Sequence, residues 1–285
     1  MLQRERDRAQ GLNTAGFISG YRGSPLGMYD HALWRAKSFL KQHDIEFCAG
    51  PQRGSGGDRR VGQPAGRHVP GAKVDGVFGI WYGKGPGVDR SADALKHANS
   101  AGTSPNGGVI ALAGDDHGCQ SSTLAHQSEQ VFAAALMPVV NPATLQDYLD
   151  LGILGFALSR YSGCWVGFKA ISETVESSAS IVSDPDRIKI IMPDDFEMPP
   201  GGLGIRWPDA PLEQERRLHG PKMAGGCGVR ARQPVRPHRA GLKAGAARHH
   251  GDRQGLSRSR GRRWPISASP MPRRRRSDCA SIRWR

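Results

Sequence analysis

The 285-residue sequence contains only five cysteines, and no two of them form a C-x-x-C pair. They stand at positions 48, 119, 164, 227 and 279. Clustered zinc and iron–sulfur sites depend on closely spaced cysteines, and a disulfide framework depends on many cysteines in a short chain. The spacing therefore argues against these sites within this sequence and favours a reducing compartment.

Long apolar runs are also absent. No uninterrupted stretch approaches the roughly eighteen apolar residues that a membrane-spanning helix needs. The N-terminal sequence MLQRERDRAQG lacks the apolar centre of a signal peptide. We therefore expect a cytoplasmic protein that makes no membrane contact. With 38% hydrophobic and 7% aromatic residues, the chain still has enough apolar side chains for a folded core.

Acidic residues are scarce at one end of the chain. Residues 220–285 contain sixteen arginines and two lysines but only two aspartates and no glutamate, a surplus of sixteen positive charges. Residues 1–219 hold 22 basic and 24 acidic residues, so the net charge of +14 belongs to the tail. Clustered cations such as RRRR at 273–276 suit a nucleic-acid backbone. The tail has only Trp264 and Trp284 as aromatic residues, so we expect no specific recognition of nucleic acid.

Residues 1–219 alternate short apolar runs with helix-forming segments and Gly-rich turns, the pattern of a parallel α/β fold. The apolar runs predict strands at residues 15–19, 45–47, 76–81, 108–113, 137–140 and 188–192. Helices are expected at the N-terminus and around residues 32–40, 90–99, 128–135 and 145–158, the last with Thr144 as its N-cap. Beyond Leu218 the sequence predicts no element. In such a fold, ligands are expected in the turns beyond the strand ends.

Three of these turns carry polar side chains. GYRGSPLG (20–27) places Arg22 after the first strand, where it could hold a carboxylate, and a plain turn is the alternative. GKGPGVDR (83–90) has the glycines and cation of a phosphate-binding loop but lacks the spacing of a nucleotide motif. GDDHG (114–118) has residue types that ligate divalent metals, and an aspartate-rich turn that caps the next element is the alternative.

Two single residues also admit two interpretations. His126 in HQSE is either a general acid or base, or a structural histidine. Cys164 in SRYSGCWVGFK is a candidate nucleophile only if a base lies nearby, and we expect it to lie in the core.

Taken together and in order, five motifs resemble the N-terminal region of the indolepyruvate ferredoxin oxidoreductase family: GYRGSPLG, WYGKGPGVDRS, LAGDDHG, QSSTLAHQSE and SRYSGCWVGFK. The likeness covers residues 1–50 and 69–219. It implies a thiamine-diphosphate-binding domain of the pyrimidine type at residues 1–219, an α/β fold with a parallel sheet. The Arg-rich tail at 220–285 has almost no apolar periodicity, so we expect it to be disordered or aberrant. The implied reaction is the oxidative decarboxylation of 2-oxoacids such as indolepyruvate, with ferredoxin and coenzyme A as further partners.

The resemblance also implies roles for particular residues. Substrate would lie against Arg22, Gly23, Ser24 and Pro25. The cofactor would lie against Gly83, Lys84, Gly85, Pro86, Gly87 and His126. No metal site is implied for this chain, because the Mg²⁺ and diphosphate of the cofactor and the iron–sulfur clusters belong to other domains of the full-length family. A homo-oligomer is expected.

Residues 51–68 depart from the family pattern. Family members are expected to read about NEDLAATAVWG there, with a glutamate that protonates the cofactor's pyrimidine nitrogen. This chain has Gln52 and Arg53 instead. Read one base late, the codons for residues 52–62 can spell NEDLAATAVW, which places the glutamate at Arg53. Parts of residues 229–284 also become family-like in shifted frames. We infer that frameshifts, from sequencing error or gene decay, interrupt the coding sequence and that the literal chain is inactive.

Three hypotheses about function follow. The first is an N-terminal part of a 2-oxoacid oxidoreductase. The second is a non-catalytic folded fragment. The third is nonspecific nucleic-acid binding through the basic tail.

Overall fold

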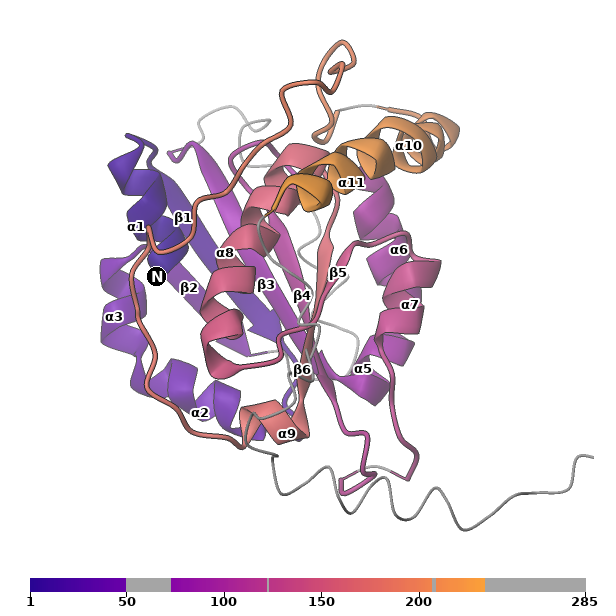
Figure 1. The fold of residues 1–285 in the computed structure, drawn as a ribbon. Coiled ribbons are helices and arrows are strands. Elements are labelled where there is room, and N and C mark those ends of the chain that lie inside the picture. Colours follow the sequence, from indigo (N-terminus) through magenta and orange to yellow (C-terminus); the bar gives the residue numbers. More distant parts are fainter. Residues whose placement is uncertain (50–72, 122, 207–208, 234–285) are drawn as a thin grey trace, which may run out of the picture. The chain divides into compact units, whose positions relative to one another are not determined.

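Six parallel strands form one sheet in the computed structural model, in the order β2-β1-β3-β4-β6-β5 (Figure 1). The structure describes residues 1–49, 73–121, 123–206 and 209–233. The strands are β1 (Thr14–Gly20), β2 (Ile45–Ala49), β3 (Gly76–Lys84), β4 (Val109–Asp115), β5 (Val139–Val140) and β6 (Val166–Ile171). Every neighbouring pair runs parallel. The predicted fold class, an α/β domain with a parallel sheet, is confirmed.

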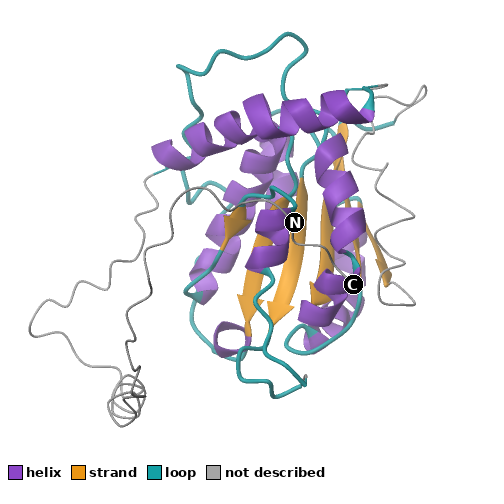
Figure 2. Cartoon of the chain, turned by 90° about the vertical axis from the view of Figure 1, so that its right-hand side faces the viewer, coloured by secondary structure: helices purple, strands orange, loops and turns teal. Residues whose placement is uncertain are grey.

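Helices cover both faces of this sheet, as the side view shows (Figure 2). One face carries α1 (Leu2–Ala9), α2 (Gly27–Arg35), α3 (Lys37–Gln42) and α8 (Leu145–Ser162). The other face carries α5 (Gly85–Arg90), α6 (Ala92–Ala101) and α7 (Glu129–Ala134). The short helix α9 (Ser172–Val175) follows β6. Helix α10 (Pro211–Arg217), a π-helical turn (Leu218–Lys222) and α11 (Met223–Arg232) come last in the described residues.

Each face of the sheet has its own apolar core, because successive side chains of a strand point to opposite faces. Phe78 of β3 packs on one side with Leu33 of α2 and Phe156 of α8. Trp81 of the same strand lies in the other cluster, with Phe132 of α7. The strands are thus covered on both faces, which explains why their sequences are almost continuously apolar.

Helix α8 starts where the sequence predicts. Thr144 accepts a hydrogen bond from the Asp147 amide at 3.3 Å, and the Asp147 carboxylate accepts one from the Thr144 amide at 2.9 Å. This reciprocal capping box satisfies two amides at the helix start and confirms Thr144 as the N-cap. The helix runs past Leu158 and ends at Gly163, whose φ of +70° is the left-handed conformation that favours glycine.

Three predictions about elements are wrong. Residues 188–192 form no strand, and the last strand of the described chain is β6, within a segment for which we predicted none. The expected turn at residues 82–89 is divided between the end of β3 and helix α5. The chain beyond Leu218 is helical as far as Arg232.

The segment that includes residues 188–192 follows a course outside the sheet. Its Ile191 donates a hydrogen bond to the Gln233 side chain at 3.3 Å and accepts one back at 2.7 Å. Val182 forms the same reciprocal pair with the Gln146 side chain, at 2.8 and 3.1 Å. Side-chain amides therefore satisfy backbone groups of this segment, and tertiary contacts override the β-propensity of the sequence IKIIM.

Residues Met1–Val235 constitute one compact unit. Within the described ranges, no helix has both the length and the apolar character needed to cross a bilayer. The predictions for residues 51–68, including Arg53, and for residues 234–285 of the tail fall outside the described residues.

Candidate functional site

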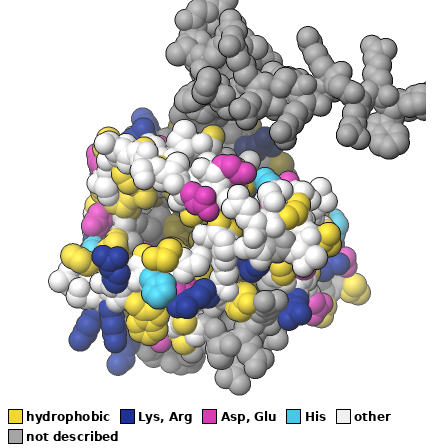
Figure 3. Space-filling view, turned by 90° about the horizontal axis from the view of Figure 1, so that it is seen from below, with side chains coloured by type: hydrophobic (Ala, Val, Ile, Leu, Met, Phe, Trp, Pro, Cys, Tyr) yellow, Lys and Arg dark blue, Asp and Glu magenta, His cyan; other side chains and the backbone are white. Residues whose placement is uncertain are grey.

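The carboxyl ends of the parallel strands meet at one edge of the sheet. The turn at residues 21–26 follows β1, helix α5 follows β3, and the loop at residues 116–128 follows β4. Figure 3 views this edge directly and shows basic, acidic and histidine side chains on a face that is hollowed near its centre. All three segments carry residues that the sequence predicts for the site, so this edge is the candidate functional site.

The turn after β1 lies across the two neighbouring strands. A Cβ at Gly23 would lie 2.4 Å from Cδ of Lys84 in β3. A Cβ at Gly114 in β4 would lie 3.1 Å from Cδ of Pro25. The backbone of the predicted substrate turn is therefore packed against the ends of β3 and β4, while the side chains of Arg22 and Ser24 are exposed.

Arg22 is held in place by Asp30, a residue to which the sequence assigned no role. The Nε of Arg22 lies 3.4 Å from Oδ2 of Asp30 in α2. Asp30 is 5% exposed, whereas the Arg22 side chain is 55% exposed. Because Nε is the inner nitrogen of the guanidinium, this ion pair leaves the two terminal nitrogens for another acceptor. An aspartate in the first turn of the following helix was the available signal.

Asp30 also lies beside a buried tyrosine. Burial raises the pKa of Tyr82, and the neighbouring Asp30 carboxylate raises it further. The Tyr82 hydroxyl therefore stays protonated next to the Asp30 carboxylate.

Lys84 is the last residue of β3. Its Nζ donates to the carbonyl oxygen of Ser121 at 3.1 Å, which uses one of its three N–H groups. Helix α5 follows at once, with Pro86 in its first turn, where a proline removes no helical hydrogen bond. The predicted cofactor residues 83–87 therefore span the end of a strand and the start of a helix.

The three glycines of GKGPG have different surroundings. Gly83 lies under the Trp81 ring, where a Cβ would come within 2.9 Å of the nearest ring carbon. Gly85 lies against His126, where a Cβ would come within 2.4 Å of the His126 Cβ. At Gly87 a Cβ would meet the Tyr21 ring at 3.5 Å. Of these three glycines, Gly85 is the one that touches another predicted site residue.

Both ring nitrogens of His126 lie beside oxygen atoms. Its Nδ1 lies 3.0 Å from the carbonyl oxygen of Leu124, and its Nε2 lies 3.2 Å from Oδ2 of Asp89 in α5. The ring is mostly buried, with 18% of the side chain exposed. The structure thus fastens the loop after β4 to the helix after β3 through this imidazole.

A cavity of about 590 Å³ lies between these segments. It is lined by Lys84, Pro86, Gln120, Ser121, Thr123, Leu124 and His126. Three predicted cofactor residues therefore line one cavity, and the substrate turn adjoins it where Gly23 contacts Lys84. Gln120, Ser121 and Thr123 were not predicted as site residues, although the motif QSSTLAHQSE contains them.

The carboxylates of GDDHG make hydrogen bonds within the protein. Asp115 accepts from the Ser128 amide at 2.9 Å and from its hydroxyl at 2.5 Å, beside the start of α7. Asp116 accepts from the Ser121 amide at 2.7 Å, and this bond is the main reason why the pKa of Asp116 lies below its usual value. Both carboxylates thus accept hydrogen bonds from serines of the loop that follows β4. Within the described ranges, no three His, Cys, Asp or Glu side chains are arranged to hold a metal ion.

Cys164 lies in the core at the start of β6. Its side chain is inaccessible to solvent, and burial raises the pKa of its thiol. The thiol is therefore unsuited to act as a nucleophile.

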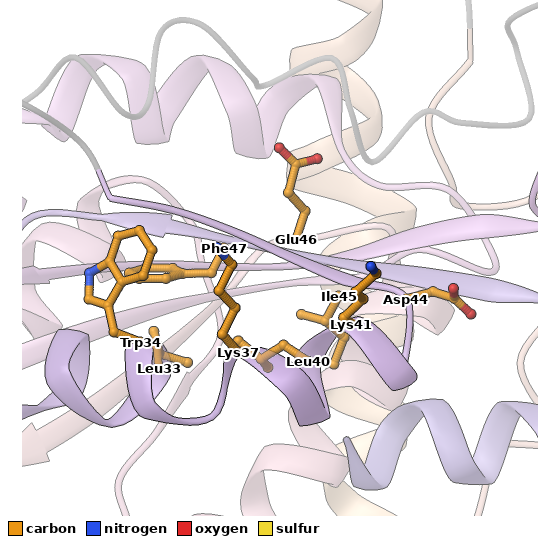
Figure 4. Close-up of a pocket in the computed structure, with 9 residues that line it drawn as sticks. All are labelled: Leu33, Trp34, Lys37, Leu40, Lys41, Asp44, Ile45, Glu46 and Phe47. Carbon is orange, nitrogen blue, oxygen red and sulfur yellow. The ribbon is translucent and has the colours of Figure 1, made fainter.

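A second cavity, of about 390 Å³, lies along β2 beside α2 and α3 (Figure 4). Trp34 and Phe47 pack edge to face there, with ring centroids 5.2 Å apart, and Nζ of Lys37 lies 5.9 Å from the Trp34 ring centroid. No residue predicted for substrate or cofactor lines this cavity. The carboxyl edge therefore remains the better candidate.

The chain matches no family model and no curated protein. Among solved structures, it is similar to the X-ray structure of a proposed thiamin diphosphate-dependent enzyme from Mycobacterium smegmatis, with 16% identity and a TM-score of 0.38. The match covers 64% of this chain and 33% of that one, so the chain spans about a third of that protein's length. A likeness of this size identifies no family, and the functional argument depends on the residues of the site.

Proposed function

We propose that the chain is the pyrimidine-type domain of a thiamine-diphosphate-dependent enzyme that oxidatively decarboxylates 2-oxoacids such as indolepyruvate. One observation carries the proposal. The turn with Arg22 and the strand end with Lys84 are far apart in sequence, yet Gly23 packs directly on Lys84, and His126 packs on Gly85. Residues proposed for substrate and for cofactor thus form one continuous site.

In this proposal Arg22 binds the substrate carboxylate. A guanidinium pairs with a carboxylate through two parallel hydrogen bonds when its terminal nitrogens are available. The ion pair with buried Asp30 fixes the inner nitrogen and so directs the terminal nitrogens of Arg22 outward. Ser24, in the same turn, is proposed to assist with its hydroxyl.

The cavity suits the cofactor's aminopyrimidine ring in part. Pro86 and Leu124 offer apolar wall, and Gln120 and Ser121 offer polar groups. When bound, thiamine diphosphate would supply the carbon nucleophile and the electron sink for decarboxylation. The chain's own task would be to hold the ring and to exclude water from its edge.

The acid that protonates the ring nitrogen is proposed to be the glutamate at the position of Arg53, in the restored reading frame. Arg53 itself lies outside the described residues. An arginine cannot donate a proton at neutral pH, so the literal chain would be a non-catalytic domain. Ferredoxin, coenzyme A, Mg²⁺ and iron–sulfur clusters would act with the rest of the full-length homo-oligomeric enzyme.

The frame-restored enzyme is the full-length protein that the gene encodes once the reading frame is corrected at residues 51–68 and after residue 222. The variant Arg22→Ala of this enzyme tests the proposal. Loss of a charge-assisted bond worth roughly 2–3 kcal/mol should raise KM for the 2-oxoacid about 100-fold. The titration with thiamine diphosphate should be unchanged. Arg35→Ala, at an exposed position of α2, is the matched control and should alter neither quantity.

The converse pattern would overturn the assignment. If Arg22→Ala leaves KM unchanged but weakens the titration with thiamine diphosphate, the turn at residues 22–25 serves the cofactor and not the substrate.

A further inference from the structure

Lys169 is a charged residue in the middle layer of the protein. It lies on β6, where it pairs in register with Ala113 of β4, and its side chain is only 7% exposed. No prediction from the sequence assigned it a role. A buried ammonium is costly unless it is paired, so its partners show what it does.

Its Nζ lies among groups from three segments. Oε2 of Glu129 in α7 is 2.7 Å away, and Oδ2 of Asp115 at the end of β4 is 3.7 Å away. Nε2 of His117, in the loop that follows β4, is 3.4 Å away. Burial opposes ionisation of Glu129, but Lys169, a backbone amide and the neighbouring His117 together outweigh it, so the pKa of Glu129 lies below its ordinary value.

These partners mark the two ends of the loop at residues 116–128. Asp115 immediately precedes the loop and Glu129 immediately follows it. Asp115 also accepts two hydrogen bonds from Ser128, which join the ends directly. The Lys169 ammonium therefore lies between the carboxylates of Asp115 and Glu129, which stand at the two ends of the loop.

The loop provides most of the wall of the cavity at the carboxyl edge. Its residues Gln120, Ser121, Thr123, Leu124 and His126 line that cavity. Inside the loop, Asp116 holds Ser121, and Ser121 accepts from Lys84. The position of this wall therefore depends on the loop's closed ends.

We propose that Lys169 is a positioning residue for the cavity, acting as a charge latch that holds the ends of the loop at residues 116–128 together. The importance of Lys169 for catalysis rests on the proposed function. Its role in holding the two ends of the loop together does not depend on that function. Removing the ammonium leaves the Asp115 and Glu129 carboxylates close together without their shared cation, and like charges at such a separation repel. The loop should then open while the sheet stays folded.

Hydrogen–deuterium exchange of the purified chain tests the latch without any ligand. In Lys169→Met, amides of residues 117–121 and 123–127 should exchange about tenfold faster, because local opening becomes easier, while amides of β1 and β3 should keep their rates. Lys169→Arg, which retains the charge, should restore most of the protection. Lys189→Met, at an exposed position outside the site, is the control and should change nothing.

A second variant separates charge from packing. Lys169→Met combined with Glu129→Gln removes one of the two carboxylates, so the loop should recover protection relative to Lys169→Met alone. If Lys169→Met alone does not fold, the exchange of the double variant can still be compared with that of the wild type.

Two results would overturn the latch. If loop exchange is unchanged in Lys169→Met, or if β1 and β3 lose protection to the same extent as the loop, Lys169 only supports the core. If the double variant remains as unprotected as the single one, charge balance is not the cause. A frame-restored enzyme that binds no thiamine diphosphate, with the exchange pattern as expected, would instead refute the proposed function and leave the latch intact.

Discussion

The contact between Gly85 and His126 joins two of the segments that form the candidate site. His126 reaches it from the loop after β4, and a Cβ at Gly85 would overlap both its Cβ and its ring. A gap of 2.4 Å between carbons is far below van der Waals contact, so one partner would have to move. Glycine at position 85 is therefore needed for the imidazole to lie between Leu124 and Asp89.

Gly85→Ala should displace His126. The ring would lose its 3.2 Å approach to Asp89, and we expect the NMR chemical shifts of the His126 ring protons to change in the purified chain. Gly87→Ala is the matched control, two residues along the same helix, because its Cβ would meet the Tyr21 ring at an ordinary 3.5 Å.

Equal responses from the two alanine variants would contradict this. Such a result would mean that helix propensity in α5, and not the contact with the imidazole, governs the position of His126.

At the scale of elements, Asn99 joins three of them. Its Nδ2 donates to the carbonyls of Ala135 and Leu136 at 2.7 and 3.0 Å, and its Oδ1 accepts from the Trp165 amide at 2.9 Å. The side chain is fully buried in α6, and its partners stand after α7 and before β6. One amide thus satisfies three backbone groups that would otherwise lie unpaired in the core.

Asn99→Ala should lower the free energy of unfolding by about 3 kcal/mol, because buried backbone groups lose their partners. Urea unfolding followed by circular dichroism measures the loss. Lys96→Ala, exposed on the same helix, should change stability by less than about 0.5 kcal/mol. A comparable loss in both variants would show that helix α6 itself, and not the bridging amide, is at fault.

Helix α1 is fastened to α8 by a buried ion pair. Asp7 is 1% exposed and accepts from both terminal nitrogens of Arg160, at 2.6 and 2.8 Å. Thr14 and Gln3 donate to the same carboxylate. Burial opposes ionisation of Asp7, but the charge and hydrogen bonds of Arg160, together with the hydrogen bonds from Thr14 and Gln3, outweigh it and lower the pKa of Asp7 below its ordinary value.

This depressed pKa predicts a pH-dependent contribution to stability. Because the folded pKa of Asp7 is lower than the unfolded one, its contribution is present above the unfolded pKa and is lost as pH falls through the folded pKa. Asp7→Asn should therefore cost about 3 kcal/mol at pH 7 and progressively less at acidic pH. Asp93→Asn, 90% exposed, should show neither effect. A pH-independent difference between wild type and Asp7→Asn would rule out the ion pair as its cause.

The elements differ in how far local sequence determines them. Apolar runs beside Gly-rich turns correctly predict β1, β3 and β4, because buried parallel strands read as continuous hydrophobic segments. The sequence does not predict strand β6, because Gly167 and Lys169 interrupt its apolar pattern. The structure explains both residues by distant partners: Gly167 packs against the Phe132 ring, and Lys169 forms an ion pair with Glu129. The strand expected at residues 188–192 fails for the same reason, since Gln233 satisfies Ile191 from a distant helix.

The site was predicted in a similarly uneven way. Lys84, Pro86 and His126, to which the resemblance assigns the cofactor, line one cavity, and their role there stays a prediction. Asp30 and Lys169 were not predicted. Asp30 offered only its place in the first turn of α2 as a signal, and a lone lysine in a strand carries no local signal of the partner it will meet. Their roles become visible only in the ion pairs with Arg22 and Glu129.

At the scale of the whole molecule, the charge and the recognisable motifs both change at the same point of the sequence. The surplus of positive charge begins after residue 219, where the family resemblance ends, whereas residues 1–219 are nearly neutral and carry all five motifs. The frameshift hypothesis explains both facts together. It predicts that the nucleotide sequence of the codons for residues 52–62, read one base late, spells NEDLAATAVW, whether the shift is a sequencing error or a decayed gene. A shifted frame that spells an unrelated sequence would contradict it.

The most direct test of the whole account is the reduction of a viologen dye by the frame-restored enzyme with thiamine diphosphate, coenzyme A and an aryl pyruvate. We expect turnover in that enzyme and its collapse when the restored glutamate at position 53 is changed to glutamine, since that position would then hold no acid to donate a proton to the ring nitrogen. The literal 285-residue chain should reduce no dye. Dye reduction by the literal chain, or full turnover in the glutamine variant, would contradict the account.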